Sequence, residues 1–331
     1  MKIKVFYQKL PKLVDNFYNA EREAGALMYE NFYQLSGKPF SLLPDADFLY
    51  LSKWHRKAVN LLEYGIVTHA GFIVVTGEVG AGKTTIIRRY LKDAGSDVTV
   101  GVITNSSHSL GSLLSWVATA FELDNRNSTD TIALYSTFIE FLLAQYAAGK
   151  RTVLIIDEAQ NLSADLLEEL RMLSNVNNER DQLLQIILVG QPELLDTLRR
   201  NDLRQFVQRI SVHCHLDALP PEETVAYIRH RLAVVGGKPD IFNLEACAAV
   251  HYFSGGVPRL INLLCDQAMM YGFSEDQRVI TVETVREVVK DRAKGGLSPF
   301  RALPEKPAPV EKSGLLERLL SENGGEDKVR Q

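Results

Sequence analysis

The chain contains a glycine-rich run whose residue types and spacing suit the binding of phosphate. Two glycines bracket four residues ahead of a lysine and a threonine, in the order Gly77-Glu78-Val79-Gly80-Ala81-Gly82-Lys83-Thr84-Thr85. Glycines let backbone N–H groups converge on phosphate oxygens, and a helix that begins here adds partial positive charge. We expect Lys83 to reach the β- and γ-phosphates of a nucleotide and the Thr84 hydroxyl to ligate Mg²⁺. The alternative is a glycine-rich turn with a solvated lysine.

Two adjacent acids supply a second chemical element. Asp157 and Glu158 directly follow the apolar run 152–156, and Gln191 follows another apolar run at 183–189. Phosphoanhydride hydrolysis needs a carboxylate near Mg²⁺ and a base that orients water. We expect Asp157 to hold the metal's water shell, Glu158 to polarise the attacking water, and Gln191 to contact the γ-phosphate or that water. The alternative is a set of solvated polar residues at strand ends.

Arginine suits the neutralisation of charge that develops on a transferred phosphoryl group. Four candidates lie close together in the sequence: Arg199, Arg200, Arg204 and Arg209. Such an arginine is often supplied by a neighbouring subunit, whereas most arginines on helices are simply solvated, so the residues alone do not choose among the four. Arg259 follows Pro258, which suits a first helical turn, and it is a candidate for reaching back toward the nucleotide.

Alternating strands and helices must position these residues. Apolar or β-branched runs predict strands at 72–76, 97–103, 152–156, 183–189 and 210–216. Patterns between them predict helices at 53–65, 86–91, 110–121, 129–148, 163–173 and 192–207. This alternation predicts an α/β fold with a parallel sheet and right-handed crossovers. The glycine-rich run, the two acids and Gln191 then share the carboxyl ends of the strands, where open α/β sheets bind ligands.

The pattern changes at Pro220-Pro221, after which helices are predicted at 222–235, 244–253, 258–271 and 282–294. We divide the chain into an N-terminal extension (1–27), an α/β nucleotide-binding domain (28–218), a small all-helical lid domain (219–294) and a proline-rich flexible tail (295–331). In the tail, residues 315–320 read either as a frayed end or as a short helix that docks on a partner.

Composition excludes several classes of protein. The chain has 331 residues, 46% of them hydrophobic and 24% charged, with a formal net charge of −4. That balance gives no global attraction to nucleic acid or anionic lipid. The three cysteines are far apart, which favours free thiols in a reducing compartment. We find no apolar run of membrane-spanning length and no secretory signal, and we expect a cytoplasmic protein. The triplet His213-Cys214-His215 lacks a second ligand pair, so a zinc site is not favoured.

Taken together, these motifs resemble those of AAA+ ATPases, in particular the general secretion pathway protein A (ExeA-like) family. Within that family, the chain is most similar to the secretion ATPases associated with exosortase/PEP-CTERM loci. The resemblance spans residues 28–292. It rests on 28–33, 35–40, 71–78, 156–162, 168–175, 189–194, 208–210 and 258–262. Some members of the family continue into a membrane span and a peptidoglycan-binding domain, neither of which is found in this sequence.

The resemblance implies ATP and Mg²⁺ as cofactors, with Gln191 as first sensor, Arg259 as second sensor and Arg209 as the arginine finger. It also implies a homo-oligomer, a ring or a filament, with ATP at subunit interfaces. We expect an assembly or motor ATPase that supports secretion or exopolysaccharide export at the envelope, peripheral to the inner membrane through its partners. A DNA-bound ATPase that regulates transposition is the alternative from another class, with a local basic cluster near Lys53 and Arg88 as its support. A third possibility, a switch with little turnover, is disfavoured by Asp157-Glu158.

Overall fold

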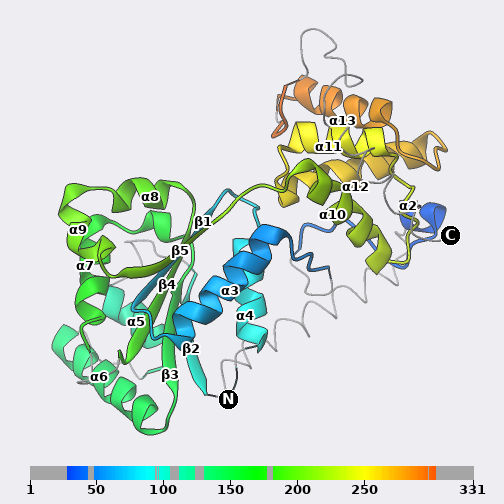
Figure 1. The fold of residues 1–331 in the computed structure, drawn as a ribbon. Helices are drawn as coiled ribbons and strands as arrows, with labels where there is room; N and C mark the ends of the chain where they lie inside the picture. The colour runs from blue at the N-terminus through cyan, green and yellow to red at the C-terminus, as the bar shows by residue number, and fades with distance from the viewer. Residues whose placement is uncertain are drawn as a thin grey trace, which may run out of the picture. The chain divides into compact units, whose positions relative to one another are not determined.

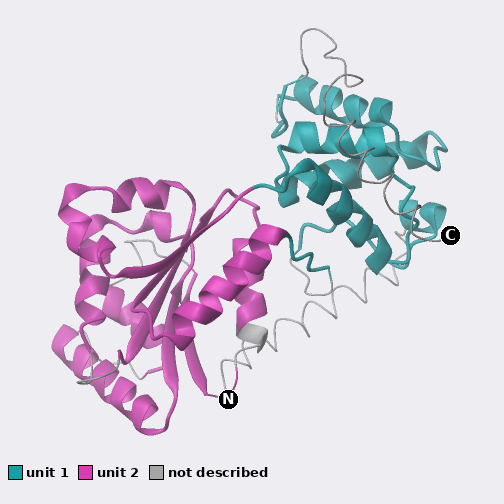
Figure 2. Cartoon of the chain, viewed as in Figure 1, with its two compact units in different colours: residues 1–52, 218–331 teal, residues 53–217 magenta. Residues whose placement is uncertain are grey.

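The computed structural model describes residues 28–43, 48–93, 95, 97–104, 112–123, 130–176, 182–296 and 298–302. The chain divides into two compact units, one of residues Lys53–Asp217 and one that combines Met1–Ser52 with Ala218–Gln331 (Figure 2). The predicted extension at 1–27 and the tail segment at 315–320 lie outside the described residues. Within the described part of the chain, no helix has both the length and the apolar character needed to cross a membrane.

The first unit, Lys53–Asp217, is built on a five-stranded sheet in the order β2-β3-β4-β1-β5 (Figure 1). Its strands are β1 (Phe72–Gly77), β2 (Val98–Ile103), β3 (Arg151–Ile156), β4 (Leu184–Gly190) and β5 (Ile210–Leu216). All four pairings between neighbouring strands are parallel. The predicted parallel α/β sheet is therefore confirmed, and β1 lies between β4 and β5.

Helices cover both faces of this sheet (Figure 1). One face carries α3 (Lys53–Val67) and α4 (Lys83–Asp93). The other carries α5 (Leu113–Ala120), α6 (Thr131–Ala147), α7 (Ala164–Leu173), α8 (Glu193–Leu198) and α9 (Arg204–Val207), with the 3-10 turns η2 (Ala159–Asn161) and η3 (Asn201–Leu203). Alternate residues of the central strands enter the two cores: on β1, Ile73 and Val75 face α3 and α4, whereas Phe72 and Val74 face the opposite layer. Burial on both faces explains why β1, β3 and β4 read as largely apolar runs, whereas the edge strand β5 alternates between buried and exposed residues.

Two details of the helices have clear local causes. Ser163 caps α7, as predicted, because its hydroxyl accepts the backbone N–H of Leu166 at 3.3 Å. Helix α3 was expected to end near Gly65 but continues to Val67. A Cβ on Gly65 would lie 2.6 Å from Ile73 Cδ1. Gly65 therefore serves the close approach of α3 to β1 and does not stop the helix.

The second unit is helical. It contains α10 (Pro221–Val234), α11 (Leu244–Ser254), α12 (Pro258–Ser274) and α13 (Val282–Lys294), together with α2 (Met28–Tyr33) from the other end of the chain. The predicted change to helices after Pro220 agrees with this structure. The packing of α10 to α13 around a shared apolar core makes the unit compact.

Residues 28–52 differ from the expected assignment, which grouped them with the α/β domain. In the structure, Tyr29 and Phe40 belong to the core of the helical unit. The Tyr29 hydroxyl donates to Asp266 on α12, and the buried Arg231 of α10 donates to the carbonyl oxygen of Pro39 at 2.5 Å. Aromatic burial and these long-range hydrogen bonds fix the segment to the helical unit.

Candidate functional site

The glycine-rich loop connects the end of β1 to the start of α4. Gly80 and Gly82 have φ values of +83° and +98°, which residues with a Cβ rarely adopt. A Cβ on Gly77 would also lie 2.9 Å from the carbonyl oxygen of Leu216 on β5. The glycines at these three positions therefore meet backbone requirements of the fold, and the strand–loop–helix geometry predicted from the sequence is present.

Lys83 is buried, and its ammonium group folds back over the loop. Its Nζ donates to the carbonyl oxygens of Gly77 at 2.7 Å and Glu78 at 3.0 Å. Burial lowers the pKa of Lys83, while the nearby carboxylates of Glu158 and Asp157 oppose that shift. The ammonium is thus held by two neutral carbonyl groups, which phosphate oxygens could replace with a stronger charge-assisted contact.

The loop and the acidic pair meet at Thr84. The Thr84 hydroxyl donates to Asp157 Oδ2 at 3.3 Å, although the two residues are far apart in the sequence. Burial raises the pKa of the Asp157 carboxyl, and the Glu158 charge adds to that effect, whereas the hydrogen bond from the Glu158 N–H lowers it. A half-buried carboxylate beside a hydroxyl is a donor set that fits Mg²⁺, which prefers oxygen ligands and keeps several waters.

Glu158 is exposed and has an unusual backbone conformation, with φ +54° and ψ +39°. Its Oε2 accepts hydrogen bonds from Gln160 Nε2 at 2.6 Å and from Gln191 Nε2 at 3.4 Å. Gln191 follows the last residue of β4, and its backbone N–H donates to Gln160 Oε1 at 3.0 Å. The structure therefore brings Glu158 and Gln191 together at the carboxyl edge of the sheet.

The four candidate arginines have different surroundings. Arg199 and Arg200 form exposed ion pairs with Asp196 and Asp202, and Arg204 is an exposed residue at the start of α9. Arg209 donates to the carbonyl oxygen of Arg171 at 3.3 Å and to Ser174 Oγ at 3.0 Å.

The position of Arg209 relative to the sheet separates it from the loop. Arg209 directly precedes β5, a strand of seven residues, so it lies at the amino edge of the parallel sheet. The loop, Asp157 and Gln191 lie at the carboxyl edge, about 20 Å away by strand rise. An arginine side chain cannot span that distance within the subunit.

Arg259 is exposed on the first turn of α12, directly after Pro258. It belongs to the helical unit, whereas the loop belongs to the α/β unit. Its contact with the nucleotide therefore stays a prediction.

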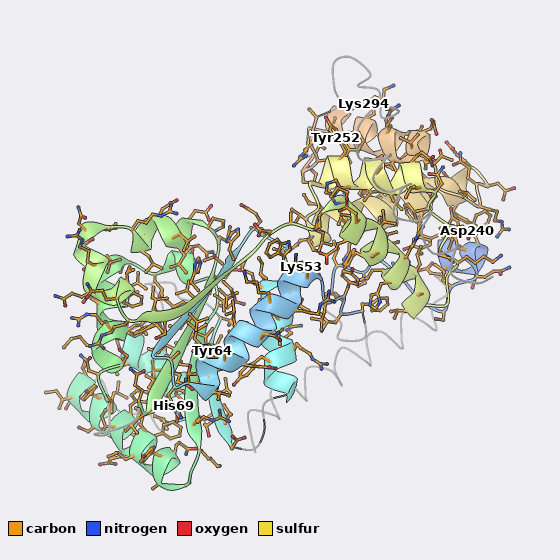
Figure 3. The ribbon with its side chains drawn as sticks, viewed as in Figure 1. Lys53, Tyr64, His69, Asp240, Tyr252 and Lys294 are labelled. Carbon is orange, nitrogen blue, oxygen red and sulfur yellow. The ribbon has the colours of Figure 1, made fainter. Side chains whose placement is uncertain are left out.

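Two residues of this region were not singled out from the sequence. His55, buried on α3, faces the loop, and its Nε2 lies 3.0 Å from the carbonyl oxygen of Ala81. It lies two residues after Lys53, which is labelled in Figure 3. Gln160 contacts Glu158, as described above. The closeness of Gln160 to Glu158 in the sequence was a usable signal, whereas nothing in the sequence connects His55 with the loop.

The His213-Cys214-His215 triplet has another use in the described structure. His213 Nε2 and His215 Nδ1 lie 3.2 Å and 2.9 Å from the hydroxyl of the buried Thr76 on β1. Cys214 points to the opposite face of β5, into the core that contains α3 and α4. Within the described ranges, no group of three or more His, Cys, Asp or Glu residues has the geometry of a metal site.

Comparison with known proteins agrees with this architecture. A family model described as an AAA domain matches residues 67–198. General secretion pathway protein A of Aeromonas hydrophila is 41% identical over 253 residues, which cover 76% of this chain and 46% of that protein. The chain thus spans about half the length of this curated relative.

Two solved structures share the fold at low sequence identity. The ORC2 protein of Aeropyrum pernix, in its ADPNP-ADP complexes, has a TM-score of 0.54 at 16% identity, covering 76% of this chain and 68% of that chain. The CDC6P protein of Pyrobaculum aerophilum has a TM-score of 0.57 at 16% identity, covering 75% and 71%. The fold expected from the sequence is confirmed, and the chain is similar to general secretion pathway protein A, as expected, whereas a closer likeness to the exosortase-associated ATPases stays a prediction.

Proposed function

We propose that this chain, whose match to an AAA domain and likeness to general secretion pathway protein A point to an AAA+ ATPase, hydrolyses ATP to drive an assembly or transport step in secretion. The observation that carries the proposal is the hydrogen bond between Thr84 and Asp157 at 3.3 Å. This contact joins the phosphate-binding loop to the acidic pair at one edge of the sheet, where Lys83 and Glu158 also lie.

Each residue of this cluster has a role that its contacts support. Lys83 exchanges the carbonyl oxygens of Gly77 and Glu78 for the β- and γ-phosphate oxygens. Thr84 and Asp157 would hold Mg²⁺, which, when bound, would neutralise charge on the phosphates. Glu158, exposed beside the loop, accepts a proton from the attacking water and aligns it with the γ-phosphate. Gln191 donates its side-chain amide toward the same water or to the γ-phosphate.

Arg209 acts in this scheme on a neighbouring subunit. It lies at the amino edge of the sheet, on the far side of the unit from its own loop. Its two hydrogen bonds, to the carbonyl oxygen of Arg171 and to Ser174 Oγ, both come from Nη1, so they orient the guanidinium group that the scheme offers to a second molecule. We therefore propose a homo-oligomer, a ring or a filament, in which nucleotide is bound at subunit interfaces, with Arg259 as a further contact from the helical unit.

The biological process is drawn from the relative, whose name assigns it to a general secretion pathway. We propose that the chain serves export of protein or exopolysaccharide at the cell envelope, from the cytoplasmic side of the inner membrane. The competing role, ATP-dependent regulation of transposition, requires DNA binding, and an ATPase assay with and without DNA separates the two roles. Stimulation of turnover by duplex DNA, with a steep salt dependence, would favour the transposition role.

The decisive experiment compares Glu158→Gln with the wild-type chain. We expect the rate of phosphate release to fall by roughly 10²–10⁴-fold, because general base catalysis contributes about that much, while Mg²⁺-dependent ATP binding is retained. Glu140→Gln, an exposed carboxylate on α6, is the matched control and should have normal turnover. Unchanged turnover in Glu158→Gln would remove Glu158 from the reaction and overturn the assigned mechanism.

A further inference from the structure

Gln160 connects two functional elements that belong to different strands. Its side-chain amide donates through Nε2 to Glu158 Oε2 at 2.6 Å and accepts, through Oε1, the backbone N–H of Gln191 at 3.0 Å. Glu158 follows β3, and Gln191 follows β4. Both ends of a single amide are therefore used, and the bridge runs from the strand that carries the base to the strand that carries the sensor.

The bridge is closely fitted to the end of β4. A Cβ added to Gly190 would lie 3.1 Å from Gln160 Oε1 and 3.3 Å from the Gln160 backbone nitrogen. A larger residue at position 190 would therefore push the amide of Gln160 out of place by a few tenths of an ångström. Close packing against Gly190 restricts the rotamer of the half-buried Gln160, so its amide group has a defined orientation.

The backbone of Glu158 adds a second reason for the bridge. Its φ of +54° places this non-glycine residue in the left-handed region, directly before the 3-10 turn η2 that carries Gln160. Such a conformation costs roughly 1–3 kcal/mol and persists when surrounding contacts hold it. Gln160 is two residues after Glu158, and the turn brings the two side chains together at the carboxyl edge of the sheet, where their hydrogen bond forms.

We propose that Gln160 is a positioning residue for Glu158, which fixes the orientation of the carboxylate relative to the end of β4. This inference rests on the proposed function, because it needs Glu158 as the base. Gln160 does not touch the reacting atoms. Gln160 donates one amide hydrogen to Glu158 Oε2 and accepts the backbone N–H of Gln191, so the carboxylate of Glu158 is fixed relative to the end of β4. Oε1 of Glu158 stays available to the attacking water.

Gln160→Glu tests the proposal without removing the anchor. The substitution keeps a side-chain oxygen that accepts the Gln191 N–H, and it nearly preserves the volume of the side chain. It also replaces the amide donor by a carboxylate oxygen, which cannot share a 2.6 Å contact with the Glu158 carboxylate. Gln160→Met removes both hydrogen bonds. Asn161→Asp, the same amide-to-acid change at the exposed next residue, is the matched control for charge.

The expected results separate positioning from a structural role. We expect Gln160→Glu to lower kcat by roughly 10–100-fold, the loss typical of a misplaced reacting group. The Kd for a fluorescent ATP analogue with Mg²⁺ should stay within about threefold of wild type, since the loop is untouched. In single-turnover measurements, Gln160→Glu combined with Glu158→Gln should be no slower than Glu158→Gln alone, because the residue acts through Glu158. Asn161→Asp should behave as wild type.

Two outcomes would overturn the inference. Wild-type kcat in Gln160→Glu would mean that the amide donor does not matter, and a further loss in the double variant would mean that Gln160 acts independently of Glu158. Failure of the proposed function is recognised separately: Glu158→Gln would then retain wild-type turnover. If Glu158→Gln is inactive while Gln160→Glu is fully active, only the positioning role is wrong.

Discussion

Gly82 is the position at which one added methyl group tests how closely the phosphate-binding loop is packed. Its φ is +98°, and a Cβ there would lie 2.7 Å from Nε2 of His55. The His55 ring is buried and lies 3.0 Å from the carbonyl oxygen of Ala81, so it has little freedom to move. A positive φ costs an alanine about 1–2 kcal/mol, and overpacking costs roughly 1–3 kcal/mol. We therefore expect Gly82→Ala to destabilise the unit by roughly 2–5 kcal/mol.

The measurement is the melting temperature of the nucleotide-free protein. For a unit of the size of Lys53–Asp217, each kcal/mol lowers Tm by about 2–4 °C, so the expected loss is roughly 4–20 °C. Gly149→Ala is the control for the backbone term alone. Gly149 also has a positive φ, +68°, but no atom lies within 4 Å of its added Cβ. Its loss in Tm should be the smaller of the two.

A second background isolates the contact with His55. In a His55→Ala protein the ring is absent, so Gly82→Ala retains only the cost of its backbone conformation. Its effect there should be smaller than in the wild-type background by about 1–3 kcal/mol. Equal losses in the two His55 backgrounds, or equal losses for Gly82→Ala and Gly149→Ala, would refute the packing argument.

Three further predictions follow from the described contacts. Burial raises the pKa of Asp157, so above pH ~4 this carboxyl holds its proton more tightly in the folded protein than in the unfolded chain. The nucleotide-free protein therefore becomes less stable as pH rises and the Asp157 carboxyl becomes charged. Asp157→Asn should raise Tm near pH 7.5, with a gain that shrinks toward pH 4, whereas a lower Tm at pH 7.5 would contradict this. If Arg209 acts between subunits, mixing inactive Arg209→Ala and Glu158→Gln chains should restore up to about a quarter of the wild-type ATPase rate, while no recovery in a mixed oligomer would contradict the assignment. Burial raises the pKa of Cys214 to about 11 and of Cys247 to about 12, so a thiol reagent at pH 8 should modify these buried side chains only after denaturation, and rapid labelling of the native protein would disprove their burial.

Much of the α/β unit could be predicted because its physical signals are local. Parallel strands covered on both faces, such as 152–156, must be apolar throughout, and each site residue follows such a run. Once the sheet is parallel, Asp157 and Gln191 necessarily share an edge with the loop. The closeness of Thr84 and Asp157 is therefore predictable from the sequence.

The parts that escaped prediction depend on tertiary contacts. Gln160 lies close to Glu158 in the sequence, but its contact with the backbone N–H of Gln191 and the left-handed conformation of Glu158 are not signalled by residue type. His55 contacts the loop because α3 crosses β1 closely at Gly65. Tyr29 and Phe40 are large apolar residues that could enter either core, so their type does not say which unit would bury them.

The helical unit is discontinuous along the chain, and this has a consequence for synthesis. Residues 28–52 leave the ribosome before all of Lys53–Asp217, whereas the helices that bury Tyr29, Tyr33 and Phe40 are made afterwards. At about 5–20 residues per second, synthesis of Lys53–Asp217 takes roughly 8–30 s, during which these aromatic side chains have no helices to pack against. The sheet can form during that interval, but the early aromatic segment stays uncovered and open to chaperones or aggregation. A shortened chain that stops after Asp217 would leave the aromatic segment permanently exposed, whereas one that begins at Lys53 would lack that segment.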